Sequence, residues 1–258
     1  MRKELIVLLA SNLDESGGGR ETWLKNFLSD PDLLDEYHSI TVLGKNITPT
    51  SNQILFVDKV KVISADFEQT KVIPGIISYI LFVRKTLTSL YNKDSSYHCI
   101  ACGSWSESIA MYVSGIFNKC NVKKISWLRS VMIKELFRIY PKFILPFCQK
   151  LELMVLKKYD LVISNGYDTR DYYLKLKVQS TVIPNSIHTE KFGTDKNGGA
   201  IFQHIGRVSK EKGVLYLFQA IEKYNLKYKD NKFKFHFFGD GPEMSNLEKL
   251  SQKHKNLT

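Results

Sequence analysis

The sequence predicts an α/β protein built on parallel β-sheets. Short apolar runs typical of buried strands alternate with amphipathic helix patterns along the chain. The first run, 5–10, is continuously apolar, as expected for a parallel strand that helices cover on both faces. A polar, glycine-rich segment at 193–199 interrupts this alternation and predicts a linker between two domains, 1–187 and 188–258.

The predicted elements follow one another in the order expected for repeated strand–helix units. The expected strands are 5–10, 39–43, runs within 54–63, 98–102, 123–128, 161–164, 181–184, 200–205 and 232–238. The expected helices contain residues 23–28, 73–90, 104–117, a short segment from 168, 214–221 and 244–250. Only two strands and two helices follow the linker. Because two parallel strands cannot bury both faces of a sheet, we expect the second domain to be incomplete, with the chain cut off after Thr258.

Composition favours a globular protein with an anionic partner. The 258 residues include 37 Lys and Arg against 26 Asp and Glu, a net charge of +11. Such an excess indicates a nucleotide, a nucleic acid or an acidic membrane surface. Because the sequence has no helix-turn-helix, zinc or aromatic-sheet signature, nucleic acid is not expected. The apolar runs 5–10 and 76–83 are too short for a signal peptide and a membrane span, respectively, so we expect a cytoplasmic protein.

The four cysteines do not predict a metal site. Cys99 and Cys102 form a C-x-x-C pair, but there is no second pair at zinc spacing. Their surroundings, 97–103, are apolar and predict a buried strand. We therefore interpret both thiols as core side chains.

A strand–turn–helix junction at 204–213 predicts an anion site. It places Arg207 and Lys212 between an apolar run and an amphipathic helix. A helix N-terminus offers unpaired N–H groups and the positive end of a dipole, and two cations add full charge. The alternative is a solvated surface turn, where Lys and Arg usually lie.

A glycine cluster after the first strand forms a second candidate loop. Gly17, Gly18 and Gly19 lie between a predicted strand and a predicted helix, where missing side chains let the backbone approach a ligand. The alternative is a tight turn without a ligand. The spacing does not fit the G-x-G-x-x-G dinucleotide fingerprint.

Four motifs, in this order and spacing, resemble the family-4 glycosyltransferases of the GT-B fold, which has two Rossmann-like domains. They are the glycine-rich loop Gly18-Gly19-Arg20-Glu21; the segment Val182-Ile183-Pro184-Asn185-Ser186-Ile187 with Phe192; Gly206-Arg207 through Lys212-Gly213; and Phe238-Gly239-Asp240-Gly241-Pro242 with Leu247 and Leu250. The resemblance spans nearly the whole chain.

This resemblance implies retaining transfer of a sugar from a nucleotide-sugar donor to a glycan or lipid-linked acceptor, in bacterial surface-polysaccharide or lipopolysaccharide assembly. It implies an acceptor-side first domain and a nucleotide-sugar-binding second domain, with no cofactor and no essential metal. Arg207 and Lys212 would be the catalytic cations that stabilise the diphosphate leaving group. The implied donor-binding residues are Asn185, Gly206, Gly239, Gly241 and Pro242. The loop Gly17 to Gly19 would approach the donor phosphate or the acceptor.

Two departures from the family pattern stand out. Many relatives carry a His at the end of the strand that here reads Ile125-Ser126-Trp127-Leu128-Arg129, so Arg129 is expected to contact an anion or to form a surface salt bridge. The Glu-x7-Glu motif that binds sugar and ribose in relatives would follow Thr258. The alternative function is therefore a truncated, non-catalytic glycosyltransferase fragment.

The segment 123–158 combines cations with apolar side chains. It holds nine Lys or Arg against Glu135 and Glu152, together with Trp127, Phe137, Phe143, Phe147 and other large apolar residues. This composition fits peripheral contact with an anionic membrane, at its inner face. The alternative is a pair of core helices with a solvated lysine face.

Overall fold

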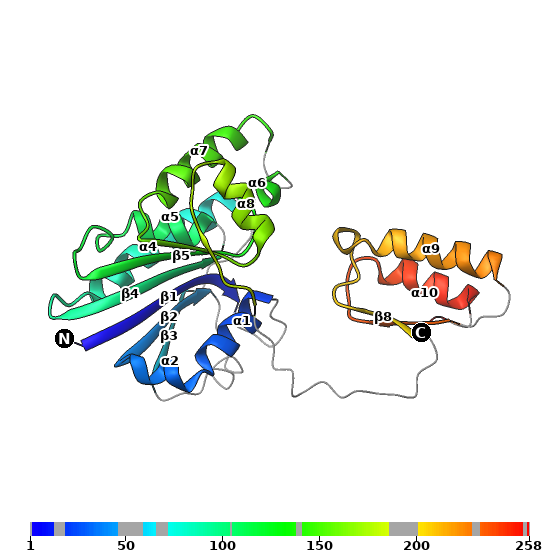
Figure 1. Ribbon diagram of the computed structural model, residues 1–258, viewed down its shortest axis with the longest axis horizontal. Coiled ribbons are helices and arrows are strands. Elements are labelled where there is room, and N and C mark those ends of the chain that lie inside the picture. The colour runs from blue at the N-terminus through cyan, green and yellow to red at the C-terminus, as the bar shows by residue number, and fades with distance from the viewer. Residues whose placement is uncertain are drawn as a thin grey trace. The chain divides into compact units, whose positions relative to one another are not determined.

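The computed structural model divides into two compact units, Met1–Ile187 and His188–Thr258. The structure describes residues 2–12, 19–45, 59–65, 72–103, 105–137, 141–185, 201–228, 233–254 and 257. Both units combine helices with parallel strands (Figure 1). Their roles as acceptor-side and donor-binding domains stay predictions.

The first unit contains a seven-stranded sheet of order β3-β2-β1-β4-β5-β6-β7. All six neighbouring pairs are parallel. The strands are β1 (Arg2–Asn12), β2 (Ser39–Lys45), β3 (Val60–Ala65), β4 (Ser95–Gly103), β5 (Val122–Leu128), β6 (Leu161–Ser164) and β7 (Thr181–Val182). The chain adds strands outward from β1 to β3, then returns to place β4 on the other side of β1. This reversal makes a topological switch point between β1 and β4.

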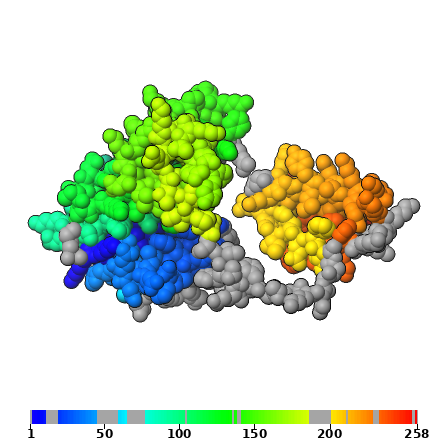
Figure 2. All heavy atoms as spheres, in the orientation of Figure 1, coloured from blue at the N-terminus to red at the C-terminus, as the bar shows by residue number. Residues whose placement is uncertain are grey.

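Helices cover both faces of this sheet (Figure 1). On one face lie α1 (Gly19–Leu28) and α2 (Pro31–Glu36); on the other lie α4 (Val72–Leu90), α5 (Trp105–Tyr112) and α7 (Leu145–Leu156). Central strand β1 buries Leu5, Val7 and Leu9 with α1, and Ile6 and Leu8 with α4 and α5. The prediction that 5–10 is a strand covered on both faces is confirmed. In the space-filling view, the atoms of these helices and strands adjoin one another over the visible face of the unit (Figure 2).

Short helices were not predicted from periodicity. Helix α2 has six residues and begins after Asp30, whose carboxylate accepts hydrogen bonds from the backbone N–H groups of Asp32 and Leu33. The five-residue α6 (Met132–Leu136) was likewise not predicted. In contrast, the nine-residue α8 (Tyr167–Lys175) confirms the short helix expected from residue 168.

The helix expected over 104–117 is shorter than predicted. It ends at Tyr112, and the backbone then forms turns. The Ser114 hydroxyl donates to the carbonyl oxygen of Met111 at 2.6 Å. Ser and Gly favour such turns over helix, because the hydroxyl competes for backbone groups and Gly115 lacks a side chain.

The second unit pairs β8 (Ile201–Ile205) with β9 (Lys234–Phe238) in parallel. The short 3₁₀ turn η2 (Lys210–Lys212) precedes α9 (Val214–Lys227), and α10 (Met244–Lys253) follows β9. Both α-helices lie on the same side of the strand pair (Figure 1). Large apolar side chains of the strands remain exposed, namely Ile201, Phe202, Ile205 and Phe238. These side chains form the kind of surface that further elements cover in larger parallel sheets.

The packing of α4 predicts a contrast between two leucines on the same helix. Leu87 is fully buried, whereas Leu81 is 59% exposed. Leu87→Ala should lower the free energy of unfolding of the first unit by about 2–5 kcal/mol, because it leaves a cavity. Leu81→Ala should change it by less than about 1 kcal/mol. Urea unfolding monitored by tryptophan fluorescence measures both, and equal losses would contradict the assigned packing of α4.

Candidate functional site

A fully buried carboxylate lies at the switch point of the first unit. Glu107, in the first turn of α5, accepts hydrogen bonds from the Ala10 backbone N–H at 2.9 Å and the Ser106 hydroxyl at 2.6 Å. Arg20 Nη1, from α1, lies 3.6 Å from Glu107 Oε1. Glu107 thus ties together the ends of β1 and β4 and the start of α1. No motif in the sequence marks Glu107 as a site residue.

Gly103 ends β4 directly beside this carboxylate. A Cβ atom at this position would lie 2.2 Å from Oε1 of Glu107, far inside contact distance. Only glycine lets Glu107 approach the backbone this closely. The requirement for glycine here is therefore steric.

Arg129, immediately after β5, lies at the same carboxyl-terminal edge of the sheet. Its guanidinium packs over the ring of Trp23, 5.2 Å from the centroid, and Nη2 donates to the Asn185 side-chain oxygen at 2.7 Å. The Asn165 side-chain amide donates to the Arg129 carbonyl at 2.8 Å and fixes the backbone. Burial lowers the pKa of Arg129 from its ordinary value, and the charge of Arg20 also lowers it.

A cavity of about 330 Å³ adjoins Arg129. We call it the Arg129 cavity; its lining includes Arg129, Lys134, Asn165, Gly166, Asp168 and Thr169. These residues follow β5 and β6 and begin α8. The cavity therefore lies outside the carboxyl ends of parallel strands, where α/β sheets bind ligands.

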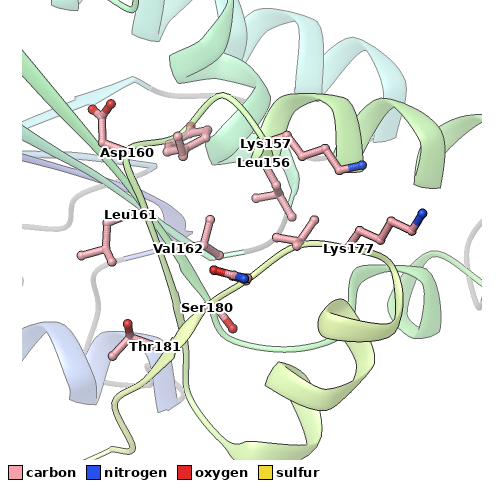
Figure 3. A pocket seen from close by; sticks show the side chains of 11 residues that line it. Leu156, Lys157, Asp160, Leu161, Val162, Lys177, Ser180 and Thr181 are labelled. Atoms are coloured by element: carbon pink, nitrogen blue, oxygen red, sulfur yellow. The ribbon is translucent and has the colours of Figure 1, made fainter.

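A larger cavity, about 410 Å³, lies at the opposite edge (Figure 3). It is lined by residues that precede β6 and β7, including Lys157, Asp160 and Lys177. The Asp160 carboxylate lies on one side of it, and the two lysine side chains extend on the other (Figure 3). Because the amino ends of parallel strands are not the usual ligand edge, we do not place the site there.

In the second unit, two predicted motifs form one pair of loops. The Gly206 N–H donates to the carbonyl of Phe238, and the Val208 N–H donates to that of Asp240, both at 2.9 Å. The loops thus continue the pairing of β8 and β9 beyond the strands. A Cβ atom on Gly239 would lie 2.0 Å from the Gly206 carbonyl oxygen. A backbone this close to its neighbour requires glycine.

Arg207 and Lys212 lie on this junction. Arg207 follows Gly206, and Lys212 ends η2, one residue before Gly213. Gly213 adopts the left-handed conformation, φ 73°, and begins α9 without a side-chain cap. Both cationic side chains are exposed. The junction therefore joins two cations to an uncapped helix N-terminus, a combination suited to an anion.

The predicted site residues fall into two groups, one in each unit. Gly206, Arg207, Gly239, Gly241 and Pro242 share the carboxyl-terminal edge of β8 and β9. In the first unit, Arg129 and Asn185 are in direct contact. Gly19 is the first residue of α1, whereas Gly17 and Gly18 lie outside the described residues.

The C-x-x-C cysteines are core side chains, as interpreted from the sequence. Cys99 and Cys102 are free and buried, and burial raises the pKa of Cys99 to about 12. Within the part of the chain that the structure describes, no group of three or more His, Cys, Asp or Glu side chains could hold a metal ion. In that same part, every helix is too short or too polar to cross a bilayer. The expectation of metal-independent chemistry stays a prediction.

Comparison with known proteins identifies the fold. No protein-family model and no curated protein matches the chain. Among solved structures, a variant of TarM from S. aureus, in complex with fondaparinux, α-GlcNAc-glycerol and UDP, is similar with TM-score 0.64 and 12% identity, over 100% of this chain and 77% of that one. The lipopolysaccharide outer core galactosyltransferase WaaB is similar with TM-score 0.59 and 12% identity, over 99% and 67%. The trehalose-6-phosphate synthase OtsA is similar with TM-score 0.60 and 13% identity, over 98% and 69%.

The chain has the GT-B fold. This confirms the fold expected from the four motifs. In the GT-B fold, the site residues around Arg129 belong to the first Rossmann-like domain, and those around Arg207 belong to the second.

The loop pair of the second GT-B domain predicts a contrast between two glycines. Gly206 and Gly239 have nearly equal φ angles, 143° and 144°. A Cβ atom on Gly206 meets nothing within 4 Å, whereas one on Gly239 overlaps backbone. In both alanine variants, the strained φ should lower the free energy of unfolding of the second unit by about 1–3 kcal/mol. In Gly239→Ala, overlap with the backbone should lower it by at least about 2 kcal/mol more. Hydrogen exchange of β8 and β9 amides measures this difference, and equal exchange in both variants would contradict it.

Proposed function

We propose that the protein is a glycosyltransferase that uses a nucleotide-sugar donor. The observation that carries the proposal is the junction at the carboxyl ends of β8 and β9. Here Arg207, Lys212 and the N-terminus of α9 come together on a GT-B domain. A diphosphate is the part of a nucleotide sugar that such a group would hold.

The proposed chemistry is retaining transfer of the family-4 type. As the bond between the sugar and the diphosphate breaks, negative charge builds on the leaving group. Arg207 and Lys212 stabilise that charge, and the acceptor hydroxyl oxygen attacks an oxocarbenium-like sugar carbon as its proton passes to an oxygen of the departing diphosphate. The guanidinium and the ammonium supply the positive charge, so we propose that no metal is required.

The proposed acceptor is a glycan or a lipid-linked oligosaccharide in bacterial surface-polysaccharide assembly. Two GT-B structures similar to this chain support this class of acceptor: WaaB is described as a lipopolysaccharide outer core galactosyltransferase, and the TarM complex contains α-GlcNAc-glycerol.

A non-catalytic fragment is the second candidate. It is favoured by the exposed apolar side chains of the second unit, Ile201, Phe202, Ile205 and Phe238. A fragment of this kind would bind nucleotide poorly or not at all and would not transfer sugar, so turnover and binding must be measured on the same preparation.

Arg207→Ala should reduce turnover about a hundredfold or more, by analogy with loss of one charge-stabilising donor. Release of nucleoside diphosphate from UDP- and GDP-sugars measures turnover, and calorimetry measures nucleotide binding. Lys210→Ala, which removes an exposed cation from the same turn, is the matched control and should retain turnover. Near-normal turnover in Arg207→Ala would show that the turn does not hold the diphosphate.

The outer face of α7 supports contact with an anionic membrane. Phe143 and Phe147 are 81% and 70% exposed, and Met154 is 46% exposed. Lys150, which lies between Phe147 and Met154 on the same helical face, is exposed, and so is the C-cap residue Lys157. The only acidic residue of α7, Glu152, is buried and accepts a hydrogen bond from the Tyr173 hydroxyl. An exposed face of aromatic and cationic side chains is complementary to anionic lipid. We therefore propose that the protein works at the inner face of the membrane.

Vesicle pelleting tests this face. The pair Phe147→Ser and Lys150→Glu should lower binding to phosphatidylglycerol vesicles about fivefold or more, because each lysine near such a surface contributes about 1 kcal/mol. The matched control, Leu226→Ser with Lys223→Glu, makes the same change at exposed positions of α9 and should bind as the native chain does. Equal pelleting by both variants would remove the membrane proposal.

A further inference from the structure

At the carboxyl-terminal edge of the first unit lies a cation, Arg129, that forms no ion pair with any residue the structure describes. The acceptor of the Arg129 hydrogen bond is the neutral amide of Asn185, and Nη1 is buried without a hydrogen-bond partner among the described residues. The guanidinium stays protonated at neutral pH. Removing a cation from water without pairing it is costly. A negative charge placed next to Arg129 would therefore be stabilising.

The buried carboxylate at this edge, Glu107, is already engaged. Glu107 is fully buried and lies beside Arg20, which adds a second positive charge near Arg129. Glu107 balances Arg20, whereas no ion pair to Arg129 is formed within the described part of the chain. The Trp23 ring, packed against the guanidinium, has no charge and cannot balance it.

The Arg129 cavity offers space for the missing anion. Arg129 and the exposed Lys134 line it from the β5 side, and Gly166 begins α8 at the β6 side without a side-chain cap. One acidic side chain, Asp168, also lines it, so the charged lining residues sum to a positive charge. The volume of about 330 Å³ is large enough for a small sugar derivative.

We propose that the Arg129 cavity binds an oxyanion, a phosphate or a carboxylate, carried by the acceptor sugar. This inference rests on the proposed glycosyl transfer. The donor's diphosphate is matched by Arg207 and Lys212 of the second unit. The anion at Arg129 therefore belongs to the other substrate, and the acceptor is an acidic sugar.

Binding of three probes to the 258-residue chain tests this. The probes are glucose 6-phosphate, glucuronate and uncharged glucose, followed through the indole N–H resonance of Trp23, which contacts the guanidinium. One or both acidic sugars should shift this resonance saturably, and the one that does so identifies the oxyanion. Glucose at the same concentration should not. Equal shifts by glucose and the acidic sugars, or no shift by any probe, would overturn the proposal.

Two variants separate binding from folding. Arg129→Gln keeps a donor for Asn185 but removes the charge, and should weaken binding of the acidic sugar about tenfold or more. Lys134→Gln changes an exposed side chain, so this variant should fold normally and should weaken binding of the acidic sugar severalfold. It therefore tests the cavity even if Arg129→Gln folds poorly. Lys177→Gln, in the cavity at the opposite edge, should leave binding unchanged. Native affinity in both Arg129→Gln and Lys134→Gln would overturn the proposal.

Nucleotide titrations distinguish this inference from the function on which it rests. UDP or GDP binding that Arg207→Ala weakens, without any response to acidic sugars, would overturn the acidic acceptor alone. A response to acidic sugars without nucleotide binding would overturn the glycosyl transfer instead.

Discussion

Parallel pairing of the described strands is the constraint on which the arrangement of loops within each unit depends. Because all seven strands of the first sheet point the same way, every segment that follows a strand emerges at one edge. That edge brings together Gly103, Arg129, Asn165 and Asn185 from four different strands. In the second unit, the same rule places Gly206 and Gly239 side by side. The candidate site residues therefore lie where the topology brings loops together.

The buried carboxylate of Glu107 gives the edge of the first unit its charge distribution. It neutralises Arg20, satisfies the Ala10 backbone N–H and requires glycine at position 103. Arg129, one strand further along the sheet, contacts a neutral amide and an aromatic ring instead. Two arginines at the same edge thus have different roles: one is a structural cation, and the other is available to a ligand.

The sequence predicted the alternation of strands and helices because buried parallel strands are continuously apolar, as in 5–10. It could not predict the short helices α2 and α6, which are less than two turns long and show no periodicity. The loop pair at β8 and β9 was predicted only as two separate motifs, since the carbonyl contact at Gly239 exists only once the strands pair. Glu107 was missed because a carboxylate in an amphipathic helix usually faces solvent. The hydrogen-bond and ion-pair partners that bury Glu107, Ala10 and Arg20, lie far from it in the sequence and are brought to it only by the fold.

The strand order also bears on how the first unit can form during synthesis. Strand β1 leaves the ribosome first and occupies the middle of the sheet. Strands β2 and β3 then add on one side, and β4 to β7 add successively on the other. Every new strand meets a partner already made, so no strand must wait for a later one or be inserted between two others. The first unit can therefore grow from its centre outward while the second unit is still being translated.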